Sequence, residues 1–121
     1  MDEAGNPKRY DLEERTYEFA RRVRAFIKRL KRTWGNIEDA QQLIRSSGSV
    51  GANYIEANEA LSKKDFLMRI KICRKEAKES RLFLRLLDGD GDPETDKERQ
   101  KLINEAQELT SILGAIVRKS E

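Results

Sequence analysis

The stretch Ser46-Ser47-Gly48-Ser49-Val50-Gly51-Ala52-Asn53 decides how this chain folds. Its helix propensity is low, because each glycine costs roughly 1 kcal/mol relative to alanine and serine side chains compete for backbone hydrogen bonds. An open loop is therefore the alternative. Apolar and small positions nevertheless continue at steps of three and four from Ile37 to Tyr54, which favours one unbroken helix over residues 37–60. Small side chains in mid-helix would let a neighbouring helix approach closely, so that tertiary packing offsets the weak propensity.

The segment before this stretch predicts another amphipathic helix, over residues 11–33. Residues 1–10 have turn-forming and polar character without a hydrophobic period, and we interpret them as a flexible N-terminal arm. The apolar positions that follow recur at steps of three, four and seven, as expected for one face of a helix. This inward stripe consists of Leu12, Phe19, Val23, Phe26, Ile27, Leu30 and Trp34.

Two more helices are predicted after it, over residues 63–87 and 93–117. The first begins with Ser62-Lys63-Lys64-Asp65, which has the spacing of a capping box. The dipeptide Asp92-Pro93 provides an N-cap and a first residue for the last helix. Short connections between helices of similar length force neighbours to run antiparallel. The predicted fold is therefore an all-α, antiparallel up-down-up-down four-helix bundle over residues 11–119.

The composition argues against several classes of function. The chain contains no histidine, which removes the usual proton-transfer group near neutral pH and the commonest nitrogen ligand of metal ions. Its single cysteine cannot form an internal disulfide. No apolar run has the roughly 18 residues of a membrane span, and none resembles a signal peptide. We therefore expect a cytoplasmic protein that uses no metal, no cofactor and no membrane.

Few side chains are candidates for catalysis. The conventional nucleophiles near predicted apolar surface are Ser46, Ser47, Ser49 and Cys73. A serine–lysine dyad is formally open, but without a histidine to activate them small packing residues are the simpler interpretation. The acidic run 88–92 imitates the start of a calcium loop, yet Arg99 stands at the twelfth position, where a bidentate glutamate is needed. The sequence thus predicts no enzymatic activity.

Polar residues fall on or beside the inward stripes of the second and third predicted helices. Glu76 and Glu79, for example, are three residues apart and share one helical face. Ordinary solvated surface is one interpretation. The other is an inter-helix network of arginine, carboxylate and amide groups, which costs desolvation energy but fixes helix register. The members of this predicted network are Arg45, Asn53, Glu56, Arg69, Glu76 and Glu79.

Cations are concentrated in particular segments. Residues 20–34 contain no acid, which creates a local positive field that the net charge of +3 conceals. Lysine and arginine gain affinity for RNA or DNA by releasing counterions, and they need no fixed motif to do so. The predicted phosphate contacts are Arg21, Arg22, Arg24, Lys28, Arg29, Lys31 and Arg32, with Lys71, Arg74, Lys75 and Lys78 as second choices. A structural or protein-binding bundle, whose basic face only maintains solubility, is the alternative.

The second and third helices also carry motifs of a known family. The stretch Ser49-Val50-Gly51-Ala52-Asn53-Tyr54-Ile55-Glu56-Ala57 is followed by Lys64-Asp65-Phe66, Glu76-Ala77-Lys78-Glu79-Ser80 and Phe83-Leu84. On these motifs, over about residues 10–87, the chain resembles the bacterial four-helix bundle proteins encoded in intervening sequences of large-subunit ribosomal RNA genes. The accessory variability determinant of diversity-generating retroelements is a relative of that family. The chain departs from the pattern at Gly51, which replaces a frequent proline, and at Ala57, which replaces the usual glycine.

This resemblance implies a homopentameric ring of bundles with a positively charged surface. In the retroelement relative the ring binds nucleic acid and a reverse transcriptase, so both are candidate partners that the resemblance suggests. Nothing in the sequence identifies a reverse transcriptase beside this protein. For the intervening-sequence members no enzymatic activity is established, which agrees with the non-enzymatic function expected from the residues.

Overall fold

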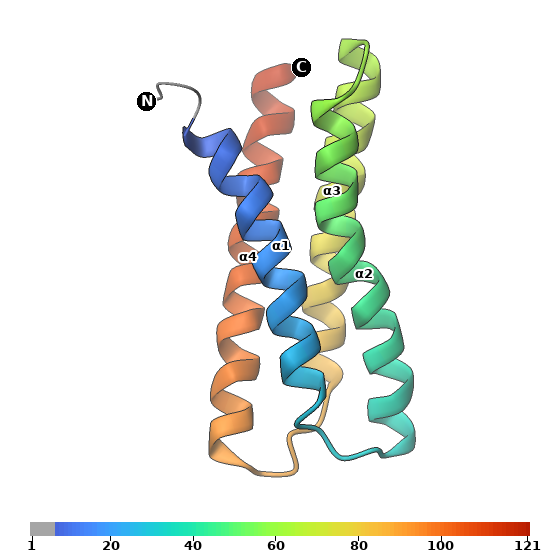
Figure 1. Ribbon diagram of the computed structural model, residues 1–121, viewed down its shortest axis with the longest axis vertical. Coiled ribbons are helices and arrows are strands. Elements are labelled where there is room, and N and C mark those ends of the chain that lie inside the picture. Colours follow the sequence, from blue (N-terminus) through green and yellow to red (C-terminus); the bar gives the residue numbers. More distant parts are fainter. Residues whose placement is uncertain (1–6) are drawn as a thin grey trace.

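The computed structural model is an all-α four-helix bundle and describes residues 7–121, with side chains from Leu12 onward. Each helix packs against its neighbours in the sequence and α4 closes against α1, whereas α1 and α3 lie diagonally across the core, with no Cα atoms of their described residues within 8 Å of each other. The α1–α2 and α3–α4 connections lie at one end of the bundle, and the α2–α3 connection lies at the other (Figure 1). The helices are α1 (Pro7–Ile27), α2 (Trp34–Asn58), α3 (Lys63–Leu86) and α4 (Pro93–Ser120).

The glycine- and serine-rich stretch 46–53 lies within the unbroken helix α2, which confirms the prediction. The small residues permit the expected close approach. A methyl group on Gly51 would lie 3.3 Å from Oγ1 of Thr16 on α1, and Thr16 is buried. On the α3 side, the hydroxyls of Ser46 and Ser80 share a buried hydrogen bond of 2.9 Å. Packing on two sides therefore offsets the weak helix propensity of this stretch.

The predicted starts of α3 and α4 are also present. The side chain of Ser62 accepts a hydrogen bond from the N–H of Asp65, and that of Asp92 accepts one from the N–H of Thr95. Pro93 occupies the first turn of α4, where a missing N–H costs nothing. In the turn between the two helices Gly91 has a φ of 73°, the left-handed conformation that glycine adopts without steric cost.

The first helix differs from the prediction at both ends. The expected arm 1–10 lies partly outside the described residues, and from Pro7 onward the chain belongs to α1. The helix ends at Ile27 and not at residue 33, because the N–H groups of Arg29 and Leu30 turn back to carbonyls three residues earlier. The prediction that Trp34 packs in the core was wrong.

The core contains the predicted inward residues of α1 except Trp34, but on α2 the prediction was partly wrong: Ile37 and Ile44 are exposed, and Leu43 and Val50 are buried instead. The largest fully buried side chains of the core include Phe19 and Phe26 from α1, Leu43 from α2, Ile70 and Leu84 from α3, and Leu102, Leu109 and Leu113 from α4. The α1–α4 contact has a polar component as well. The guanidinium of Arg15 binds Glu105 in a bidentate ion pair, with nitrogen–oxygen distances of 3.1 and 2.8 Å. Cations of α1 therefore help to hold α4.

Candidate nucleic-acid interface

Several of the cations predicted to contact phosphate, on α1 and just after it, form ion pairs with carboxylates of the protein. Arg21 pairs with Glu18 at 2.7 Å, Arg22 with Glu98 at 3.4 Å and Lys31 with Asp90 at 2.7 Å. Arg24 instead donates to the main-chain carbonyls of Ala20 and Ile44. Lys28, Arg29 and Arg32 are exposed and form no ion pair within residues 12–121. The cluster that looks uniformly basic in the sequence is therefore partly neutralised.

The two basic regions do not form one surface. Because α1 and α3 lie diagonally across the core of the bundle, their outward-facing cations lie on different sides of the molecule. The second-choice residues on α3 must be considered as a separate site.

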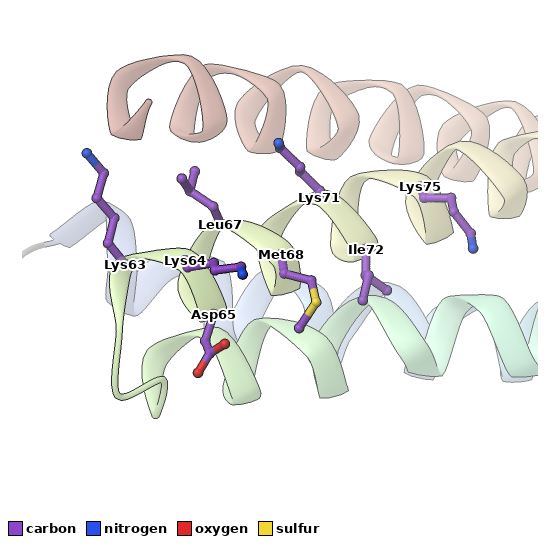
Figure 2. Close-up of a pocket in the computed structure, with 8 residues that line it drawn as sticks. All are labelled: Lys63, Lys64, Asp65, Leu67, Met68, Lys71, Ile72 and Lys75. Carbon is purple, nitrogen blue, oxygen red and sulfur yellow. The ribbon is translucent and has the colours of Figure 1, made fainter.

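A continuous row of cations runs along α3 on the side that faces α4. Its members follow one another at alternating steps of three and four, the spacing of a single helical face. At 1.5 Å per residue the row is about 21 Å long. Figure 2 shows Lys71 projecting toward α4, whereas Met68 and Ile72 project toward α2. We refer to this row as the basic stripe; it consists of Lys71, Arg74, Lys78, Arg81 and Arg85.

Residues of α4 extend the basic stripe. A methyl group on Gly114 would lie 3.4 Å from Nη1 of Arg118 and 3.8 Å from Cδ of Arg74, so both arginines lie against this glycine. Arg99 donates to the carbonyls of Leu84 and Arg85 at the end of α3. Nε of Arg99 lies 3.6 Å from the carboxylate of Asp96, and the buried Nε of Arg81 has no hydrogen-bond acceptor among the described residues. Guanidinium groups therefore gather along the α3–α4 seam.

The α2–α3 network explains why the basic stripe contains so little negative charge. Arg45 of α2 binds Glu76 at 3.4 Å and Glu79 at 3.1 Å. These are the only carboxylates between residues 71 and 85, and both are turned toward α2. Within residues 12–121, Arg74, Lys78, Arg81 and Arg85 form no ion pair, while Lys71 pairs with Glu121 at 3.5 Å. Four of the five cations in the stripe thus keep their charge uncompensated.

The remaining members of the predicted polar network also come together. Arg69 donates to Oδ1 of Asn53 at 3.0 Å, and its guanidinium lies 4.0 Å from the carboxylate of Glu56. All six predicted residues therefore lie along the α2–α3 seam. Only Glu76 among them is buried, which makes the contact with Arg45 the one in which solvent screens the charges least.

The N-terminal half of α3 presents a hollow that is open to solvent. Figure 2 shows the residues that line it, all of which belong to α3: Lys63, Lys64, Asp65, Leu67, Met68, Lys71, Ile72 and Lys75. A hollow on a single helix cannot enclose a small molecule as a pocket between elements does. It adds Lys64 and Lys75 to the cations on the outer side of α3.

The candidate nucleophiles are engaged in packing. Burial raises the pKa of Cys73 to about 12, and its thiol donates to the carbonyl of Val50 at 3.4 Å. Ser46 binds Ser80, and Ser47 donates to the carbonyl of Ile44. A protonated, buried thiol is a poor nucleophile.

Sequence reasoning missed several residues of this surface. Arg81 and Arg85 continue the steps of three and four from Lys71, so the sequence did contain a signal for them. Arg99 and Arg118 carry no such signal, because the sequence does not say which side of α4 faces the stripe.

No helix among the described residues has the length and apolarity needed to cross a membrane.

Residues 8–115 match the model of the 23S rRNA-intervening sequence protein family. A crystal structure from Bacteroides thetaiotaomicron, described as a protein of unknown function from the S23 ribosomal protein family, has a similar fold. Its TM-score to this chain is 0.75 at 30% sequence identity, over 88% of this chain and 97% of that one. None of the curated proteins matches the chain.

Proposed function

The chain belongs to the 23S rRNA-intervening sequence protein family, and we propose that it is a non-enzymatic module that binds RNA or DNA through the basic stripe of α3. The observation that carries this proposal is the set of four cations, Arg74, Lys78, Arg81 and Arg85, that have no carboxylate partner within residues 12–121. A row of uncompensated cations neutralises phosphates and displaces the counterions condensed on a polyanion, and the release of those counterions favours binding.

The arrangement of charges on α3 favours phosphate contacts over a role in solubility alone. A surface that only maintains solubility can carry cations and anions intermixed, and it gains nothing from placing cations on one side and anions on the other. Here Arg45 draws Glu76 and Glu79 to one side of α3, and the cations gather on the other. The stripe also contains arginines, whose planar donors suit phosphate oxygens better than the point charge of lysine does.

We also propose that the bundle assembles into a homo-oligomer, with the pentamer implied by the family resemblance as the expected form. Large apolar side chains are half-exposed on α3, at Met68, Leu82 and Leu86, and on α2 at Ile55. Such side chains along helices are typical of contact surfaces between subunits. Assembly would repeat the basic stripe around a ring, so that several stripes could engage one polyanion. Light scattering measures the subunit number.

Charge-matched variants test the nucleic-acid proposal. The α3 triple variant replaces three exposed stripe residues, Lys71→Gln, Lys78→Gln and Arg85→Gln. The control triple variant replaces three exposed lysines of α4, Lys97→Gln, Lys101→Gln and Lys119→Gln. Fluorescence anisotropy with labelled RNA and DNA should show weaker binding by the α3 variant and little change for the control.

Other outcomes of the same titration would reject the assignment. Equal weakening of both variants would mean that net charge, and not the basic stripe, governs binding. A wild-type protein that binds neither RNA nor DNA at low salt would leave a structural or protein-binding bundle as the function.

A further inference from the structure

Trp34 is the only tryptophan of the chain, and its side chain is 90% exposed. It is the first residue of α2, at the end of the bundle where α1 stops early at Ile27. Tryptophan can bury a large apolar area, and the first buried apolar residue of the same helix is Leu43. Leaving Trp34 in water forgoes that stabilisation, so the exposure calls for a partner.

The backbone that presents Trp34 is held firmly. Thr33 caps α2 by accepting a hydrogen bond from the N–H of Asn36. The buried side chain of Asn36 donates to the carbonyls of Lys31 and Asp88 and accepts from the N–H of Asp88. The ion pair between Lys31 and Asp90 ties the same two connections together. Because this backbone is already ordered by folding, a partner that binds Trp34 would lose little further conformational entropy of the protein.

The surroundings of Trp34 are polar and cationic. Arg32 stands two residues before it, and Lys28 and Arg29 follow the end of α1; all three are exposed and without an ion pair in the described part of the chain. One and two turns along the outer face of α2 come Glu38 and Gln41, both exposed. Protein-binding hot spots lie in well-packed, desolvated surroundings, whereas Ile37, the apolar residue one turn along α2 from Trp34, is itself 40% exposed.

We propose that Trp34 is a stacking platform for an unpaired base of single-stranded nucleic acid, with Lys28, Arg29 and Arg32 contacting the adjoining phosphates. A flat aromatic ring can stack on an unpaired base of any sequence, and cations beside it can contact the phosphates. The bases of a duplex are stacked on one another and are not available for this along its side. The inference rests on the proposed function for its class of ligand. It adds a preference for single strands and a second contact site.

The platform lies at the end of the bundle toward which the basic stripe runs. Arg85 is the last residue of the stripe, and three residues later Asp88 is bonded to Asn36, two residues beyond Trp34. A strand that follows the stripe toward the C-terminal end of α3 therefore leads toward the end that presents Trp34 (Figure 1).

Because the chain has a single tryptophan, its intrinsic fluorescence reports directly on binding at Trp34. A short single-stranded oligonucleotide should quench Trp34 emission, and the blunt duplex made from it should not. Trp34→Ala should weaken single-strand binding about five- to 150-fold, the effect of losing one stacked base, and should leave duplex binding unchanged. Trp34→Phe should retain a large part of the single-strand affinity. Because Trp34 is exposed, circular dichroism should show both variants folded as the wild type.

The results separate failure of this inference from failure of the proposed function. Single-strand binding that survives Trp34→Ala at wild-type affinity, or that leaves Trp34 emission unchanged, would overturn the platform while the basic stripe stands. A lower subunit number for Trp34→Ala in light scattering would also overturn it, since Trp34 would then be a subunit contact. Absence of any nucleic-acid binding by the wild type would reject the proposed function itself.

Discussion

Asn36 and Asp88 join the two connections at one end of the bundle. Nδ2 of Asn36 donates to the carbonyl of Asp88 at 3.0 Å, and its Oδ1 accepts from the N–H of Asp88 at 2.9 Å. The two residues are far apart in the sequence, and their contact fixes where α2 begins relative to where α3 ends. It also sets the position of Trp34.

Asn36→Ala should lower the free energy of unfolding by about 2–3 kcal/mol, because it removes three side-chain hydrogen bonds worth about 1 kcal/mol each. Urea unfolding followed by circular dichroism measures this. The matched control is Asn104→Ala on the exposed side of α4, which should change stability by less than about 0.5 kcal/mol. Equal losses in the two variants would contradict the role given to Asn36.

Gly48 and Gly51 should respond in opposite directions to larger side chains. A methyl group on Gly48 would meet only the flexible end of Arg24, so Gly48→Ala should stabilise the protein by up to about 1 kcal/mol through helix propensity. At Gly51 the neighbour is the buried Thr16, so Gly51→Leu should destabilise by about 1–3 kcal/mol through overpacking. Thermal unfolding distinguishes them, and a stabilising Gly51→Leu would refute the close α1–α2 approach.

The ion pairs along the α2–α3 seam should differ in strength. Glu76 is buried, whereas Glu56 is exposed and lies 4.0 Å from Arg69. Double-mutant cycles to alanine should therefore give a coupling energy near or above 1 kcal/mol for Arg45 and Glu76, and about 0–0.5 kcal/mol for Arg69 and Glu56. Reversal of that order would mean that burial of Glu76 does not set the strength of the network.

Cys73 should resist thiol reagents in the native protein. Burial raises its pKa from 9.0 to about 12, so a disulfide reagent at pH 8 should modify it only after unfolding. Above pH 9 the unfolded chain releases this proton while the folded chain retains it. Stability should therefore fall as the pH rises from 9 toward 12, and Cys73→Ala should reduce the slope. Rapid labelling without unfolding would show that the thiol is accessible.

The number and order of the helices, the N-caps of α3 and α4 and the helical state of residues 46–53 follow from local signals, namely apolar period and N-cap chemistry. The start of α2 was predicted at residue 37, whereas the helix begins at Trp34 with Thr33 as its N-cap. The end of α1 does not follow from such signals. The apolar steps continue through Leu30 to Trp34, and no glycine or proline interrupts residues 28–33. The helix ends in the turn formed by the N–H groups of Arg29 and Leu30, and no residue type in this segment marks that point.

The candidate interface was accessible to sequence reasoning only in part. Cations can be counted in a sequence, but their ion pairs cannot, and Arg22 looks as free as Arg32 until Glu98 is placed beside it. The diagonal placement of α1 and α3, by contrast, follows from the predicted up-down-up-down topology. The choice between α1 and α3 as the phosphate-binding surface therefore depends on which cations are ion-paired, and only the packing of the helices shows this.

The salt dependence of binding tests the role of the basic stripe most directly. Anisotropy titrations with a single-stranded RNA over a range of salt concentrations give the slope of log K against log salt for the wild type and for the α3 triple variant. Each lost phosphate contact reduces the magnitude of that slope by about 0.7, so three substitutions should reduce it by about 2. An α3 triple variant with the slope and affinity of the wild type would contradict phosphate binding by this stripe.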